Sequence, residues 1–95
     1  MAEEVSAPSL FNLGQLFITS NAQEQISETD VFRALDRHAA GDWGEVGLED
    51  WQLNDQALIE GSRLLSVYWS MSRKRFWIIT EADRSSSTVL MPEDY

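Results

Sequence analysis

Hydrophobic residues change their spacing along this chain just after Gly61, and that change constrains its fold more than any other feature. Beyond it, apolar and polar side chains alternate over residues 63–70 and 75–80, on either side of a short polar link, and again over residues 87–91. A repeat of two is typical of strands with one buried face. Pro92 ends the last run because it has no N–H to extend a ladder. The last third is therefore predicted to form an antiparallel β unit that begins with a hairpin.

The residues before Gly61 follow a helical repeat in two segments. Ser27 and Asp30 resemble a capping box that opens a helix over residues 28–40, which stops at Gly41. A second helix is predicted over residues 48–60 and stops at Gly61. The expected fold class is therefore α+β: an antiparallel sheet of three to four strands with two main helices packed on one face.

The second predicted helix has one acid out of place. At 100° per residue, Asp55 falls in the middle of an apolar face. We expect this carboxylate to pair with an internal base such as Arg63; the less favoured alternative is an edge residue, with the helix phase shifted by one position. The apolar face is formed by Leu48, Trp51, Leu58 and Ile59.

The N-terminal part contains a tail and a further short strand. Residues 1–9 are small and acidic without periodicity, so they are predicted to be a flexible acidic tail before a single α+β domain at residues 10–95. Residues 14–19 are rich in strand-forming residues. We expect this segment to join the sheet, because an isolated strand would leave backbone polar groups unpaired. Residues 22–26 are predicted to form a turn or a single helical turn.

Negative charge is concentrated in the helical part. The net charge is −9, and residues 1–60 hold twelve acids against two bases, while residues 61–95 hold four against five. Such a field repels nucleic acid and attracts basic protein surfaces, so direct nucleic-acid binding is disfavoured and a protein partner with a basic surface is favoured. The alternative, without a partner, is that the acids only maintain solubility. The candidate partner-binding residues are Asp30, Asp36, Asp42, Trp43, Glu45, Glu49 and Asp50.

Several protein classes are disfavoured by composition. The chain contains no cysteine, which excludes disulfides, thiolate metal sites and a cysteine nucleophile. Its start is acidic where a secretory signal would be basic, and no apolar run approaches a membrane span. Common nucleotide-binding, metalloprotease and hydrolase motifs are missing, so no cofactor or metal is expected. A cytoplasmic location is expected, with no membrane association.

Trp43 and His38 each allow two interpretations. Trp43 lies in a glycine-rich turn, where it is either a plug over the core or, less favoured, an exposed anchor for a partner. His38 is the only histidine and hence the first candidate for acid–base chemistry. Its place on an apolar stripe favours a partly buried residue bonded to a carbonyl or to Asp42.

A second polar cluster follows the predicted strand 75–80. Glu81 and Asp83 lie two residues apart and could hold a hard cation, while Arg84 could grip a carboxylate or a phosphate. Asp83 is equally an ordinary turn residue, and Arg84 could pair with either acid, so a structural turn is favoured. A functional site would need this connection to meet His38 and the turn at residues 41–44.

A longer set of residues resembles a known family. The set consists of Arg37-His38, Gly41–Gly44, Asn54, Ala57-Leu58, Gly61, Arg63–Ser66, Tyr68, Trp77–Ser85 and Pro92–Tyr95. This pattern resembles uncharacterised small proteins carried on bacterial plasmids and other mobile elements, some of which bear the name of a restriction-system subunit. A methyltransferase role would need alternating strands and helices, which this chain lacks.

Three functional hypotheses follow. The first is a non-enzymatic interaction protein of a mobile element, whose acidic surface occupies a basic site on a host protein, in its sharpest form a CRISPR or restriction nuclease. The second is a small enzyme or ligand-binding module built from His38, Asp42, Glu81, Asp83 and Arg84. The third is a structural or regulatory homodimer formed through the aromatic face of the sheet.

Overall fold

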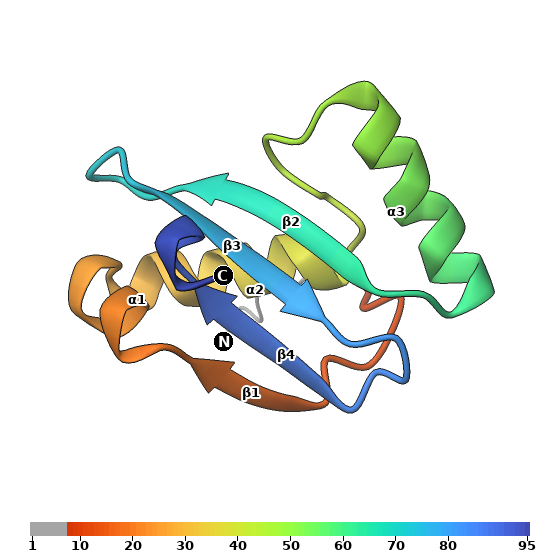
Figure 1. The fold of residues 1–95 in the computed structure, drawn as a ribbon, viewed down its shortest axis with the longest axis horizontal. Helices are drawn as coiled ribbons and strands as arrows, with labels where there is room; N and C mark the ends of the chain where they lie inside the picture. Colours follow the sequence, from red (N-terminus) through yellow and green to blue (C-terminus); the bar gives the residue numbers. More distant parts are fainter. Residues whose placement is uncertain (1–7) are drawn as a thin grey trace, which may run out of the picture.

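A computed structural model describes residues 8–95, so most of the predicted tail lies outside the described residues. The fold is α+β, as predicted, and is built around a four-stranded sheet with the strand order β1-β4-β3-β2 (Figure 1). The described elements are β1 (Gln15–Ile18), α1 (Ser20–Gln25), α2 (Glu28–Ala39), α3 (Leu48–Glu60), β2 (Leu64–Trp69), β3 (Arg75–Thr80), β4 (Ser86–Leu90) and the short 3₁₀-helix η1 (Pro92–Asp94). None of these helices is long and apolar enough to cross a bilayer.

The sheet is mixed rather than wholly antiparallel. Strands β2, β3 and β4 form the predicted antiparallel unit, with Val67 opposite Trp77 and Ile78 opposite Val89. The predicted N-terminal strand joins the sheet, but β1 pairs with β4 in parallel, with Ile18 opposite Val89. A repeat of two reports which face of a strand is buried and contains no information on its direction, which explains the difference.

Helix α2 covers one face of the sheet (Figure 1). Ser27 caps it by accepting a hydrogen bond from the Asp30 N–H at 3.2 Å. The second half of the predicted capping box is missing, because the Asp30 carboxylate instead accepts from the Met71 N–H in the β2–β3 hairpin at 3.1 Å. The buried side chains between α1, α2 and the sheet are Ala22, Ile26, Val31, Ala34, Leu35, Tyr68, Phe76, Ile78, Val89 and Met91.

Helix α3 lies beyond the β2 edge and not on the α2 face, which corrects the predicted arrangement (Figure 1). Asn54 bonds both backbone groups of Leu65: its Nδ2 donates to the carbonyl oxygen at 2.7 Å, and its Oδ1 accepts from the N–H at 3.2 Å. The adjoining loop forms a parallel bridge in which Gly44 lies opposite Val67. The chain thus covers the β2 edge of the sheet with a side-chain amide and a short backbone bridge.

The predicted apolar face of α3 was half right, because Trp51 and Leu58 pack against the core while the other two residues do not. Leu48 and Ile59 are 77% and 88% exposed, whereas Asn54 and Ala57 are buried. The helix is oriented by the Asn54 bonds and by the contact of Ala57, Trp51 and Leu58 with the cluster around Trp43 and Leu64.

The C-terminus folds over the outer face of the sheet, opposite α2. The ring of Tyr95 lies edge-on to Trp77, with centroids 5.6 Å apart, and its hydroxyl accepts from Arg63 at 3.1 Å. Asp94 accepts from Thr19 at 2.7 Å, which ties η1 to the start of α1. The homodimer hypothesis had assigned its interface to this aromatic face, part of which the chain's own terminus covers.

Candidate functional site

His38 forms a buried chain of polar contacts between α2 and the sheet. Its Nδ1 lies 2.5 Å from Ser66 Oγ on β2, and its Nε2 lies 2.8 Å from Thr80 Oγ1 on β3. Thr80 Oγ1 lies 2.6 Å from Ser87 Oγ, which donates to the Leu13 carbonyl oxygen at 2.7 Å. The predicted contact with Asp42 does not form, since both ring nitrogens are occupied by hydroxyl groups from β2 and β3.

The terminal carbonyl and the neutral state of the ring together assign every proton in this chain of contacts. Because Ser87 donates to a carbonyl, its oxygen accepts from Thr80, and the Thr80 oxygen then accepts from Nε2–H of His38. Because burial lowers the pKa of His38 to about 4, the ring is neutral near pH 7, and Nδ1 then accepts from Ser66. The result is a neutral imidazole with its proton on Nε2, fully satisfied at both nitrogens.

The Ser66–His38 contact resembles the nucleophile and base of a hydrolase, but its environment opposes catalysis. His38, Ser66 and Thr80 are each 0% exposed, so no substrate atom reaches them. Burial, helped by the nearby charge of Arg84, lowers the pKa of His38 from its ordinary value of 6.5 to about 4. A catalytic base needs a pKa near the working pH and access to its proton donor. The contacts instead stabilise the α2–sheet interface.

Asp42 pairs with Arg37 rather than with His38. The carboxylate accepts two hydrogen bonds from the guanidinium, at 2.8 Å from Nε and 3.2 Å from Nη2. It also accepts from the Gly44 N–H at 3.1 Å, which fixes the turn after α2. The Arg37 guanidinium holds the pKa of Asp42 below its ordinary value. This acid, predicted to face a partner, is largely occupied by the protein itself.

Trp43 is the plug over the core and not an exposed anchor. It is 0% exposed, and its indole N–H donates to Asp55 at 2.9 Å. The misplaced acid of α3 is therefore paired, but with Trp43 and not with Arg63 as expected. Phe11 stacks on the indole, with centroids 6.3 Å apart, and His38 lies edge-on to it at 5.6 Å.

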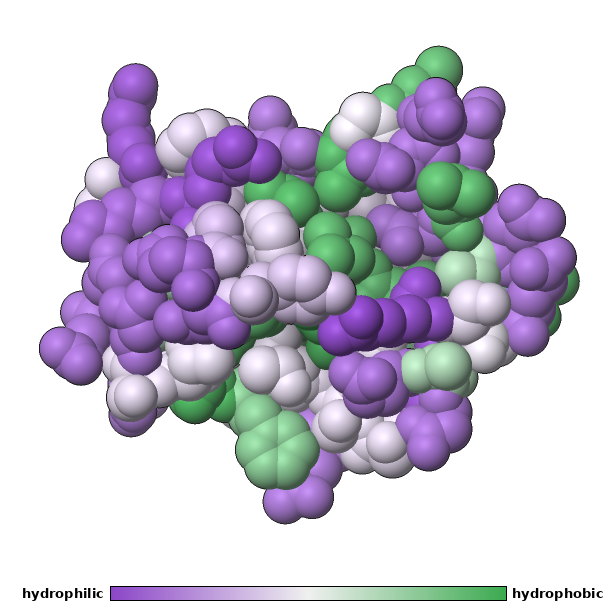
Figure 2. Space-filling view, viewed as in Figure 1, coloured by the Kyte–Doolittle hydropathy of each residue, from purple (hydrophilic) through white to green (hydrophobic). Residues whose placement is uncertain are grey.

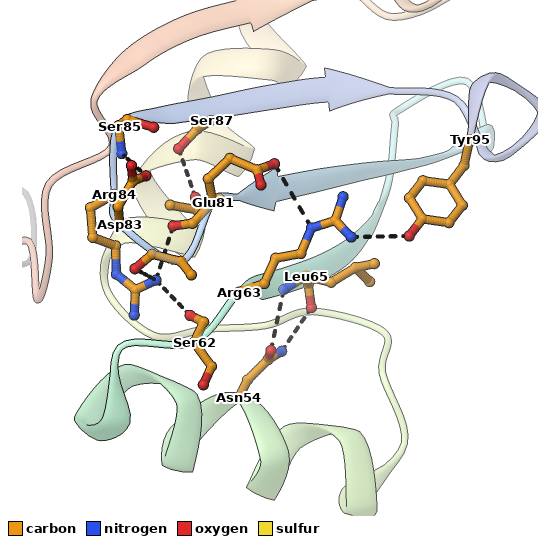
Figure 3. A network of polar contacts seen from close by, with 12 residues as sticks. Asn54, Ser62, Arg63, Leu65, Glu81, Asp83, Arg84, Ser85, Ser87 and Tyr95 are labelled. Carbon is orange, nitrogen blue, oxygen red and sulfur yellow. Dashed lines mark hydrogen bonds and ion pairs between the residues drawn. The ribbon is translucent and has the colours of Figure 1, made fainter.

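The cluster after β3 is a structural turn (Figure 3). Arg84 donates to four carbonyl oxygens: to Ser62 at 2.6 Å, to Ala57 at 3.1 Å, and to Glu81 and Ala82 at 3.2 and 3.3 Å. The Ala57 carbonyl lies in the last turn of α3, where it also accepts from the N–H groups of Gly61 and Ser62 at 2.8 and 3.0 Å. Arg84 therefore caps a helix and pairs with neither acid, contrary to the prediction.

The two acids of the same cluster point to different partners. Glu81 lies 3.8 Å from Nε of Arg63, and Asp83 accepts from the Ser85 N–H at 3.0 Å (Figure 3). Within residues 8–95 no group of three or more histidine or acidic side chains is placed to hold a metal ion. The structure does not assemble His38, Asp42 and this cluster into a common site.

The acidic residues proposed to face a partner separate into different places. Asp30 is 8% exposed and engaged by the hairpin, and Asp36 is exposed on α2, behind the sheet. Glu49 is exposed on the first turn of α3. Glu45 and Asp50 line one groove on the outer side of the molecule.

This groove, which we call the α3 groove, lies between α3, the loop before it and the outer face of the sheet, and it has a volume of ≈ 540 Å³. Its apolar surface comes from Val46, Leu53, Leu65, Val67 and Trp77, and Leu53 is 57% exposed. Figure 2 shows hydrophobic residues gathered between α3 and the sheet, with hydrophilic residues on both sides. The remaining lining residues are Glu45, Gly47, Asp50, Asn54 and Arg75.

Comparison of the chain with protein-family models, with curated proteins and with solved structures finds no match. The α3 groove was missed from the sequence because its parts come from residues 45–54, 65–67 and 75–77. In the sequence, only Glu45, Asp50 and the apolar Leu53 pointed to a binding surface. The predicted phase of the second helix placed Leu53 outside its apolar face.

Proposed function

We propose that the protein is a non-enzymatic interaction module whose α3 groove binds a segment of a partner protein that has both basic and apolar side chains. The observation that carries the proposal is the combination of an apolar floor with two exposed acids in one groove, Glu45 and Asp50. Recognition surfaces commonly place apolar contacts at the centre and charges at the rim.

Charge supports the choice of a basic partner. Arg75 is the only base that lines the groove, and its guanidinium also lies over the ring of Trp69, 5.7 Å from the centroid. The chain's net charge of −9 steers a basic partner toward the surface and raises the association rate. The apolar floor supplies affinity that is not screened by salt. Binding is therefore expected to weaken with salt without being abolished.

The sharpest form of the proposal makes the partner a defence nuclease with a basic nucleic-acid channel, of the CRISPR or restriction type. Its support is the resemblance to proteins of bacterial mobile elements together with the acidic field. A cytoplasmic location belongs to the same proposal. Inhibition of DNA cleavage by the purified nuclease, measured with increasing amounts of this protein, tests this form directly.

Charge reversal in the groove is expected to abolish capture of the partner. The double variant Glu45→Lys/Asp50→Lys replaces two attractions by two repulsions, which predicts binding weaker by about a hundredfold or more. The measurement is a pull-down from a lysate of the bacterial host, followed by titration of the purified partner.

The matched control is Glu24→Lys/Glu60→Lys. It makes the same change in net charge at two exposed acids that do not line the groove. Retained binding by this control, with loss in the groove variant, supports the groove. Equal loss in both variants would mean that only the overall charge matters, and the groove would be rejected as the binding site.

A further inference from the structure

The two edge strands of the sheet differ in how far other parts of the chain cover them. The β2 edge is covered by Asn54 and by the backbone bridge at Gly44. The other edge is β1, whose four residues are all exposed. Natural proteins protect open edges with charges, prolines or bulges, and Gln15–Ile18 contains none of these. An unprotected edge of this kind pairs readily with another strand.

The side chains around this edge are apolar on both faces. Leu16, Phe17 and Ile18 are 49%, 48% and 38% exposed, and Phe32 on α2 is 56% exposed. A groove of ≈ 330 Å³ opens between β1 and α2, and among residues 8–95 Glu28 is its only charged lining residue. In a chain of net charge −9, a nearly neutral apolar edge is the surface on which a second copy meets least repulsion.

The backbone defines which groups remain available. Gln15 and Thr19 donate to Ser85 and Val89, at 3.0 Å each, on the β4 side. Because alternate residues of a strand bond to opposite sides, the N–H and C=O groups of Leu16 and Ile18 point to the open edge. These are the groups that an added strand would bond.

The strand is complementary to itself in one antiparallel register. If Phe17 lies on a twofold axis, Leu16 of one copy is opposite Ile18 of the other, and each of these pairs exchanges two backbone hydrogen bonds. Leu16 and Ile18 pair with Ser87 and Val89, so they share the α2 face of the sheet, while Phe17 lies on the outer face. The three central side-chain pairs across the axis are then apolar, and Gln15 of each copy lies opposite Thr19 of the other.

The exposed area sets the strength of this contact. Taking an aromatic side chain at roughly 150–250 Å², the exposed parts of Leu16, Phe17, Ile18 and Phe32 amount to about 350 Å² per chain. A standard interface buries about 800 Å² per partner. The contact is therefore smaller than that of an obligate dimer and belongs to the weak, reversible class.

We infer that two copies of the chain associate reversibly through antiparallel pairing of their β1 strands, with Phe17 on the twofold axis, to form one continuous eight-stranded sheet. This interface is separate from the α3 groove and does not depend on the function proposed for it. It also differs from dimerisation through the aromatic face, which η1 and Tyr95 partly cover.

Charge substitution at Phe17 tests the register. Sedimentation velocity of the unmodified chain should show a weight-average coefficient that rises with concentration. Phe17→Lys and Phe17→Glu should each remain monomeric, because like charges meet on the axis. An equal mixture of the two variants should associate again, because opposite charges then face each other. Circular dichroism of each variant confirms that it is folded.

Cysteine cross-linking provides a second measurement. The chain has no cysteine, and Phe17 would form a non-hydrogen-bonded pair with Cα atoms about 4.5 Å apart, within the range of a disulfide. Phe17→Cys should oxidise to a covalent dimer several times faster than Ile59→Cys, which places an exposed thiol on α3. A monomer at all concentrations with no excess of cross-linking would overturn self-pairing and leave the edge to a strand of another protein.

Discussion

Replacing His38 with leucine is expected to lower the free energy of unfolding by about 3 kcal/mol, because the change leaves the buried Ser66 hydroxyl without its partner and the buried Thr80 oxygen without its donor. Leucine fills much of the same volume, so the loss reports mainly the polar contacts rather than a cavity. A domain of this size is stable by only about 5–15 kcal/mol. Urea unfolding followed by tryptophan fluorescence measures the change, since Trp43 packs against the imidazole.

A triple variant separates the hydrogen bonds from general damage to the core. Adding Ser66→Ala and Thr80→Val to His38→Leu removes the unpaired Ser66 hydroxyl and the Thr80 hydroxyl, which in the single variant keeps only its bond to Ser87; Ser87 still donates to the Leu13 carbonyl oxygen. Apolar replacement of both partners in a buried bond is close to neutral. Most of the lost stability should therefore return. If the triple variant is less stable than His38→Leu, the hydroxyls were not left unsatisfied and the assigned network is wrong.

The same residue gives the protein a pH-dependent stability. Burial lowers the pKa of folded His38 to about 4, against an ordinary 6.5 in the unfolded chain. Between these values the unfolded chain binds a proton that the folded chain does not, so stability is full above about pH 6.5 and is lost as the pH falls toward 4. A shift of this size corresponds to a loss on the order of 3 kcal/mol.

The comparison with His38→Leu isolates this dependence. Asp42 also contributes to the pH dependence of stability. Arg37 lowers the pKa of its carboxylate, so this contribution is lost as the pH falls below the ordinary pKa of an aspartate, and the variant retains it. The difference in unfolding free energy between the two proteins should therefore narrow as the pH is lowered from about 7 toward 4. A constant difference over this range would show that His38 titrates normally in the folded state.

Strands and helices were predictable where a single local pattern determined them. The prediction of α3 and β3 matches their observed bounds, and α2 ends one residue earlier than expected. In these segments a glycine stop or a clear alternation coincides with the element. The β1 segment was correctly expected in the sheet, but its parallel direction depends on pairing with β4, which lies about seventy residues further along the chain.

The candidate site was less predictable because its contacts join distant residues through polar atoms. His38 finds partners 28 and 42 residues away, and hydrophobic periodicity contains no information on which hydroxyls meet a ring. A helix pattern assigns a polar residue such as Asn54 to the solvent side. Asn54 instead faces inward, because its amide forms the two backbone hydrogen bonds that a neighbouring strand would otherwise make with Leu65. Arg84 was expected in a structural turn, paired with Glu81 or Asp83, yet carbonyl groups at the end of α3 and in its own turn occupy it.

Replacing Gly44 with alanine is expected to lower the free energy of unfolding by roughly 3–5 kcal/mol, combining backbone strain with overpacking. Gly44 has a φ of +78°, where a side chain is strained. Its added Cβ would also overlap the carbonyl oxygen of Val67 and lie 2.8 Å from the ring of Tyr68. The bridge that covers the β2 edge cannot accommodate that atom without moving. Denaturant unfolding measures the loss.

Gly61→Ala is the matched control, because Gly61 has nearly the same φ of +77° and no atom within 4 Å of the added Cβ. It should cost only about 1–2 kcal/mol. The excess loss in Gly44→Ala then measures how firmly residues 43–45 are held against β2. That attachment also positions Glu45, whose N–H donates to Val67 at 2.7 Å, at the α3 groove. Equal losses of unfolding free energy in the two variants would mean that the loop at residues 43–45 moves freely. Glu45 would then not be held in place at the α3 groove, and a preformed acidic binding site there would be rejected.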